Sequence, residues 1–110
     1  MLDPNKTLEF YRKIKETEVE LYKSGIESEF SDKDRSIFQD YREKWRRYVD
    51  TVERDIATVL VERLKQNEAD FETGIKAINQ EIQEINDTVA FLNLFERTIA
   101  TLGRIVTFPI

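Results

Sequence analysis

Five positive side chains lie close together near the middle of the chain, and aromatic residues alternate with them. They are Arg42, Lys44, Arg46, Arg47 and Arg54, interleaved with Tyr41, Trp45 and Tyr48. Cations among aromatic rings are typical of sites for phosphates and single-stranded nucleic acid. Residues 32–66 nevertheless hold nine Lys or Arg and eight Asp or Glu. We interpret the cluster as a solvated, salt-bridged helix face. Weak nucleic-acid or phosphate binding stays an alternative function, through Arg42, Arg46, Arg47 and Arg54.

Three acidic residues, Glu81, Glu84 and Asp87, repeat at intervals of three. Carboxylates on neighbouring helices can hold magnesium or a pair of metal ions. The chain has no histidine and no cysteine, which excludes imidazole and thiolate ligands, disulfides and Ser–His or Cys–His catalytic pairs. Its three glycines are isolated, so no phosphate-binding glycine loop is present. We interpret the acids as surface residues and expect no catalytic, metal or cofactor site, and therefore no enzyme.

Length and charge narrow the class of protein further. The 110 residues, of 13.1 kDa, suffice for a single domain over residues 1–110. A formal charge of −5 disfavours general affinity for nucleic acid or anionic membranes. Residues 1–6 do not resemble the start of a secretory signal, and no apolar run approaches the roughly 18 residues of a membrane span. We therefore expect a cytoplasmic protein.

Helical periodicity dominates the sequence and predicts an all-α fold. Asp3-Pro4 is a helix start signal, and Gly25 a stop signal, for a first helix over residues 4–24. Ser31 and Asp34 resemble a capping box ahead of a second helix over residues 32–66, in which apolar residues recur every three or four positions. Residues 66–70 are expected to form a turn or a kink.

The clearest pattern predicts a third helix over residues 70–103, followed by an apolar tail over residues 104–110. Its apolar residues alternate in steps of four and three, as in a coiled-coil seam: Phe71, Ile75, Ile78, Ile82, Ile85, Val89 and Leu92. Asn79, Asn86 and Asn93 lie one heptad apart beside this seam. They either fix helix register through hydrogen bonds or are ordinary polar flanking residues.

The unequal helix lengths predict a three-helix up-down-up bundle with a long antiparallel α-hairpin of the second and third helices. The first helix is about 20 Å shorter than the others, so half of the hairpin is expected to be bare. A homodimer, or a higher homo-oligomer, completes a four-helix bundle at the lowest cost. The expected interface with a second copy or a helical partner is Ile56, Val59, Leu60, Leu64, Phe71, Ile75, Ile78 and Ile82.

The function that follows is interaction: a self-associating adaptor, chaperone or scaffold. One alternative is peripheral membrane association through the apolar segment of residues 89–110, with its aromatic and aliphatic residues inserted into the interface. That segment lacks a lysine-rich polar face, so burial in the bundle or against a partner is the preferred interpretation.

Overall fold

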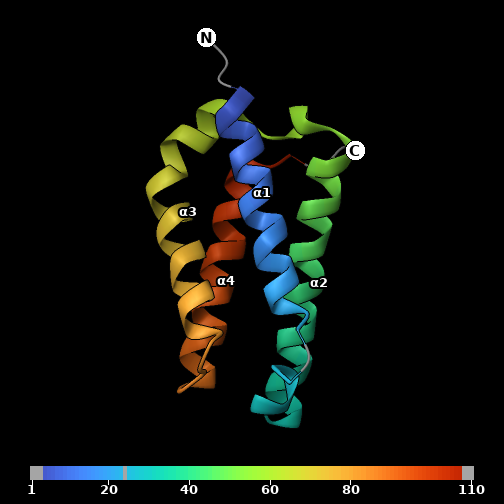
Figure 1. Cartoon of the computed structure of the whole chain (residues 1–110), viewed down its shortest axis with the longest axis vertical. Coiled ribbons are helices and arrows are strands. Elements are labelled where there is room, and N and C mark those ends of the chain that lie inside the picture. Colours follow the sequence, from blue (N-terminus) through green and yellow to red (C-terminus); the bar gives the residue numbers. More distant parts are fainter. Residues whose placement is uncertain (1–3, 24, 108–110) are drawn as a thin grey trace.

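Helices of similar length pack side by side in this chain (Figure 1). The structure is a computed structural model that describes residues 4–23 and 25–107. Over these residues it contains four α-helices and two short 3-10 turns. These elements are α1 (Pro4–Leu21), η1 (Glu27–Glu29), α2 (Asp32–Arg54), η2 (Ile56–Thr58), α3 (Val61–Glu81) and α4 (Thr88–Ile105).

The chain direction reverses at each connection between helices. Two helices that are consecutive in the sequence, α2 and α3, are not neighbours in the bundle. Helix α1 packs against α2 and α3, and α4 packs against the same two helices. Helices α2 and α3 therefore occupy opposite corners, although they follow each other in the sequence. The connection between them crosses one end of the bundle (Figure 1). The principal extents of the molecule are 46, 27 and 19 Å.

The all-α prediction is confirmed. Helix α1 begins at the predicted Pro4 but ends at Leu21 rather than at residue 24, and α2 begins at the predicted Asp32. Ser31 Oγ accepts a hydrogen bond from Asp34 N at 3.3 Å, which caps α2. The prediction of three helices, with boundaries at 32–66 and 70–103, is wrong. Each of the two long predicted helices contains a break, and the turn predicted at 66–70 lies inside α3.

The first break follows Arg54, where no glycine or proline marks it. Asp55 has an extended backbone, with φ −152° and ψ 104°, and its side chain accepts a hydrogen bond from Ala57 N at 3.0 Å. Val59 then forms an isolated antiparallel bridge with Val106. Residues 104–107 are consequently not a free apolar tail, since α4 continues to Ile105. The rest of that predicted tail lies outside the described residues.

The second break separates α3 from α4 at residues 82–87. Asp87 caps α4 because its Oδ1 atom accepts a hydrogen bond from Ala90 N at 3.0 Å. Ile82, Ile85 and Val89 keep the coiled-coil spacing through the turn, so periodicity alone gave no sign of it. Asn79, Asn86 and Asn93 therefore do not share one helix.

Aromatic side chains fill the core between α2 and α4. The Phe95 ring meets four other rings edge-on, at centroid distances between 5.7 and 6.0 Å. One of them, Trp45, is completely buried, and its Nε1 atom donates a hydrogen bond to Ile14 O of α1 at 2.8 Å. The indole therefore joins three helices and satisfies its polar atom.

Candidate interaction surface

Most residues of the predicted oligomer interface lie in the core of the chain itself. Six of them are at most 8% exposed: Val59, Leu64, Phe71, Ile75, Ile78 and Ile82. The long bare hairpin does not exist, because helices of 18, 23, 21 and 18 residues cover one another. The burial of these six side chains therefore needs no second chain. The remaining two, Ile56 and Leu60, are 42% and 39% exposed in the α2–α3 connection.

Arg42, the first residue of the predicted basic face, makes contacts that hold the bundle together. Its guanidinium donates a hydrogen bond to Leu21 O at 3.3 Å, at the end of α1, and forms an ion pair with Glu27. It also stacks over the rings of Tyr22 and Phe38, at 4.2 and 5.2 Å from their centroids. The hydrogen bond from Arg42, with a further one from Gln39, holds the pKa of Glu27 below its usual value.

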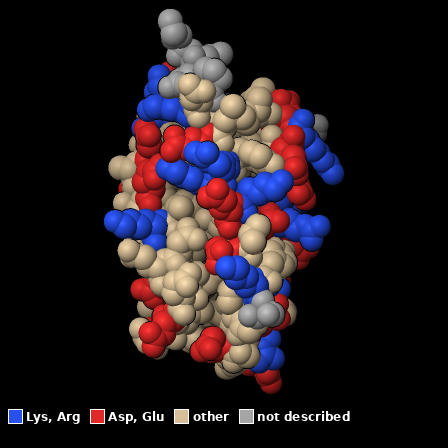
Figure 2. Space-filling view, viewed as in Figure 1, with Lys and Arg blue, Asp and Glu red and all other residues tan. Residues whose placement is uncertain are grey.

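The other three arginines of this face are exposed and lie among acidic side chains. Arg46 is 4.0 Å from the carboxylate of Asp50. A shallow hollow of about 460 Å³ lies beside it, lined by Arg42, Arg46 and Arg47 but also by Glu43 and Asp50. Figure 2 shows positive and negative side chains intermixed over α1 and α2. Around this hollow the positive side chains are therefore not separated from negative ones, as a site for a phosphate backbone would favour. Arg54 ends α2, away from this hollow.

The apolar character of residues 89–107 is largely explained by burial. The core takes Phe91, Leu92, Phe95, Leu102, Ile105 and Val106. None of the helices in the described part of the chain is both long and apolar enough to cross a membrane. Val89 is the one large apolar side chain of α4 that is mostly exposed, at 58%.

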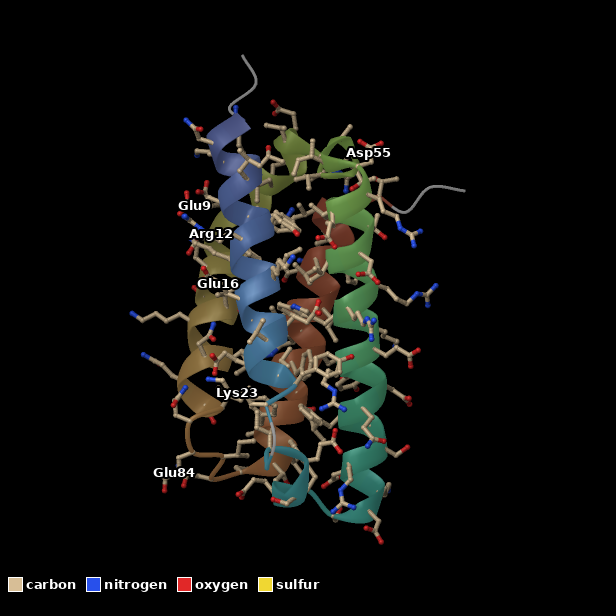
Figure 3. All side chains as sticks on the ribbon, turned by 45° about the vertical axis from the view of Figure 1, so that its right-hand side comes forward. Glu9, Arg12, Glu16, Lys23, Asp55 and Glu84 are labelled. Atoms are coloured by element: carbon tan, nitrogen blue, oxygen red, sulfur yellow. The ribbon has the colours of Figure 1, made fainter. Side chains whose placement is uncertain are left out.

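The three periodic acids do not come together. Glu81 ends α3, Glu84 points away from the bundle in the following turn (Figure 3), and Asp87 caps α4. No group of three or more acidic side chains among residues 4–23 and 25–107 is arranged to hold a metal ion.

Sequence patterns did not reveal a groove that runs between α3 and α4. It has a volume of about 360 Å³. The buried residues Gly74 of α3 and Thr98 and Thr101 of α4 form its floor, and Thr73, which is exposed, also lines it. The helices approach closely here because Gly74 has no side chain: a Cβ atom at this position would lie 2.6 Å from Thr98 Oγ1. Small residues on two segments could have indicated a close helix–helix contact. Because the prediction placed residues 70–103 in a single helix, these residues were not expected to face each other.

The charged residues that line this groove are Asp70, Arg97 and Arg104, and the two arginines both come from α4. On α1, charged side chains such as Glu9, Arg12 and Glu16 point outward along the helix (Figure 3). Helix α4 has three charged residues in 18, and two of them, Arg97 and Arg104, line the groove. Neither arginine forms an ion pair with a residue that the structure describes.

The two arginines are two turns apart on one side of α4, which corresponds to a rise of about 10.5 Å. Ala100, which is exposed, lies between them and leaves the groove open. Asp70 of α3 also lines the groove. The groove therefore has an uncharged floor, one acidic residue, and two arginines at a helical spacing that form no ion pair within residues 4–23 and 25–107.

Comparison of the chain with protein-family models, with curated proteins and with solved structures finds no match.

Proposed function

We propose that the chain is a non-enzymatic helical interaction protein, an adaptor or scaffold, that binds a helix of another protein in the α3–α4 groove. The observation that carries the proposal is the position of Arg97 and Arg104, which form no ion pair with any described residue, above a floor of small side chains. A floor of glycine, alanine and threonine lets another helix approach closely, and helix-in-groove binding buries an apolar face in this way.

The charges favour an acidic partner helix. Two carboxylates seven residues apart on one face of a helix have the same spacing as Arg97 and Arg104. Apolar or small residues between them would meet Ala100 and the floor of the groove. Arginine pairs well with carboxylates at interfaces because its fork of donors matches the two oxygens.

A second copy of this chain is a poorer occupant of the groove. In an antiparallel pair of α4 helices centred between the two arginines, Arg97 of one copy would lie beside Arg104 of the other. Like charges placed opposite each other across an interface are unfavourable. The groove therefore favours a different protein.

A designed peptide tests this proposal. The probe is an alanine-rich helical peptide with glutamates seven residues apart, and the control carries lysines at the same two positions. We expect the glutamate peptide to shift the backbone amide signals of Thr73, Ala100 and Thr101 in the ¹⁵N-labelled chain, and the lysine peptide to leave them in place. No shifts with either peptide, or shifts confined to α1 and α2, would contradict the proposal.

A further inference from the structure

The connection between α2 and α3 consists of residues that are compatible with a helix. Between Gly25 and Gly74 the chain contains no glycine and no proline. Val52, Ile56, Val59 and Leu60 continue the helical spacing of α2 across the break. The break therefore depends on hydrogen bonds, both within the connection and to the end of α4, rather than on a glycine or a proline.

The connection is held by hydrogen bonds within itself and to the end of α4. Within it, Thr58 N and Thr58 Oγ1 donate to Asp55 O at 3.1 and 2.7 Å, and Val59 N donates to Ile56 O at 3.1 Å. Two backbone hydrogen bonds join it to the end of α4: Leu60 N donates to Ile105 O, and Thr107 N donates to Thr58 O, both at 2.9 Å. The carboxylate of Asp55 also accepts from Ala57 N at 3.0 Å. Val59 is buried, but Ile56 and Leu60 stay 42% and 39% exposed. Asp55 lies at the upper end of the bundle, away from the core (Figure 3).

The connection separates two helical hairpins, α1–α2 and α3–α4, that pack against each other. Helix α2 packs mainly on α1 and α4, and α3 mainly on α1 and α4, while α2 and α3 lie at opposite corners. The α1–α2 hairpin would find the same contacts on the α3–α4 hairpin of a second copy. Only the contacts of the connection itself would change.

We propose that two copies of this chain exchange their α1–α2 hairpins, with residues 55–60 of each copy becoming helical. Helices α2 and α3 then form one continuous helix from Asp32 to Glu81. Two such helices run antiparallel past each other, and the exchange forms two bundles joined at their ends. Exchange of identical elements is a low-cost route to a dimer because it reuses contacts that the single chain already has.

The exposed side chains of the connection favour a second copy as the partner. Ile56 and Leu60 are four residues apart, so a continuous helix places them on one face. At the two-fold axis that face meets its own copy, which buries the two apolar side chains that the closed form leaves exposed. The α3–α4 groove remains within one chain, so this inference does not depend on the proposed function.

Distance measurement between two spin labels distinguishes the two forms. The chain has no native cysteine, so Lys33→Cys and Gln80→Cys provide the only labelling sites, both at exposed positions. In the closed form both sites lie at the same end of a bundle whose longest extent is 46 Å (Figure 1). In the continuous helix they are 47 residues apart, which corresponds to about 70 Å.

The experiment uses labelled protein diluted with unlabelled chain, refolded at high protein concentration, with the mass measured by light scattering. We expect a species of twice 13.1 kDa that shows the distance of about 70 Å. A chain that stays at 13.1 kDa at every concentration would overturn the proposal. A dimer whose labels stay within 46 Å would overturn it too.

A matched pair of variants tests the hinge itself. Ile56→Pro fits the closed form, because Ile56 is the first residue of a 3-10 turn and Asp55 before it is extended. The same proline breaks a continuous helix, so this variant should remain a monomer. Asp55→Ala removes the cap on Ala57 N and should increase the dimer fraction relative to the unmodified chain. Equal dimer fractions in both variants would contradict the proposal.

Discussion

Gly74 of α3 lies directly against Thr98 of α4, and this contact sets the distance between the two helices. A Cβ atom at Gly74 would lie 2.6 Å from Thr98 Oγ1 and 3.0 Å from its Cγ2. Thr98 is 2% exposed, and its hydroxyl donates to Leu94 O at 2.9 Å. Because both branches of the threonine are close, rotation of its side chain would not make room. The depth of the α3–α4 groove follows from this close approach.

Gly74→Ala should therefore destabilise the chain, although alanine is the better helix former by about 1 kcal/mol. Forcing a methyl group into a packed contact typically costs about 1–3 kcal/mol. Adding Thr98→Ala removes both branches that clash, so the double variant should be more stable than the sum of the two single changes predicts. Chemical denaturation of the four proteins measures this coupling.

Gly103→Ala is the control for this substitution. A Cβ atom there would meet Tyr48 Oη at 3.0 Å, the end of a long side chain that moves more easily than a threonine. Gly103 is exposed, so we expect stability unchanged or increased by up to about 1 kcal/mol. Equal losses in Gly74→Ala and Gly103→Ala would show that the Gly74–Thr98 contact has no special role.

Trp45 connects α1, α2 and α4, so its truncation should be costly. Trp45→Phe removes the hydrogen bond to Ile14 O and leaves unfilled volume, and we expect a loss of about 1–3 kcal/mol of unfolding free energy. Trp45→Ala should cost about 3–5 kcal/mol. Thermal unfolding followed by circular dichroism measures both. A loss in Trp45→Phe as small as that of a surface substitution would contradict this account of the core.

Glu18 should make the chain less stable as the pH rises. Burial raises the pKa of this carboxyl, Asp50 adds to the effect, and Arg46 opposes it. Its Oε2 atom is buried without a hydrogen-bond partner. The folded chain therefore binds the proton more tightly than the unfolded chain, and stability falls as the pH rises from the unfolded pKa through the folded pKa.

Glu18→Gln should remove that loss. The variant should equal the unmodified chain at a pH below this window and exceed its stability above the window. Glu16→Gln, at an exposed position of the same helix, is the control. Denaturation midpoints measured across the pH range provide the comparison. The raised pKa of Glu18 in the folded chain would be contradicted if the stability difference between Glu18→Gln and the unmodified chain did not vary with pH.

Arg42 and Arg47 belong to the same basic cluster but should respond differently to truncation. Arg42→Ala loses the hydrogen bond to Leu21 O and the stacking on Tyr22, so we expect about 1–3 kcal/mol less stability. Arg47→Ala changes an exposed side chain and should stay within about 0.5 kcal/mol. Thermal unfolding of both variants measures the two losses of stability. Equal effects would mean that Arg42 is a surface charge like its neighbour.

The fold class could be predicted from the sequence because helical periodicity and the Ser31 cap are local signals. Ser31 caps α2 as its spacing from Asp34 indicates. Most residues of the predicted interface with a second copy or a partner are buried, but they pack against other helices of the same chain. The pattern specifies that a face must be covered, while the element that covers it depends on where the helices break.

The two helix breaks have different causes, and hydrophobic periodicity indicates neither of them. After Arg54, the local cap of Asp55 on Ala57 N is joined by the bridge between Val59 and Val106, which are 47 residues apart in the sequence. At the second break, Asp87 ahead of an apolar run was a readable cap. The uninterrupted spacing of Ile82, Ile85 and Val89 masked it. The α3–α4 groove exists only because of this second break, so a single predicted helix could not include it.

Reversing the charges of Arg97 and Arg104 tests most directly the proposal that an acidic helix binds in the α3–α4 groove. The measurement is the affinity, by fluorescence anisotropy, of the glutamate and lysine peptides for the unmodified chain and for Arg97→Glu/Arg104→Glu. If an acidic helix binds between these residues, the unmodified chain will prefer the glutamate peptide and the double variant the lysine peptide. Equal affinities for both peptides in both proteins, or no binding in any combination, would contradict the account.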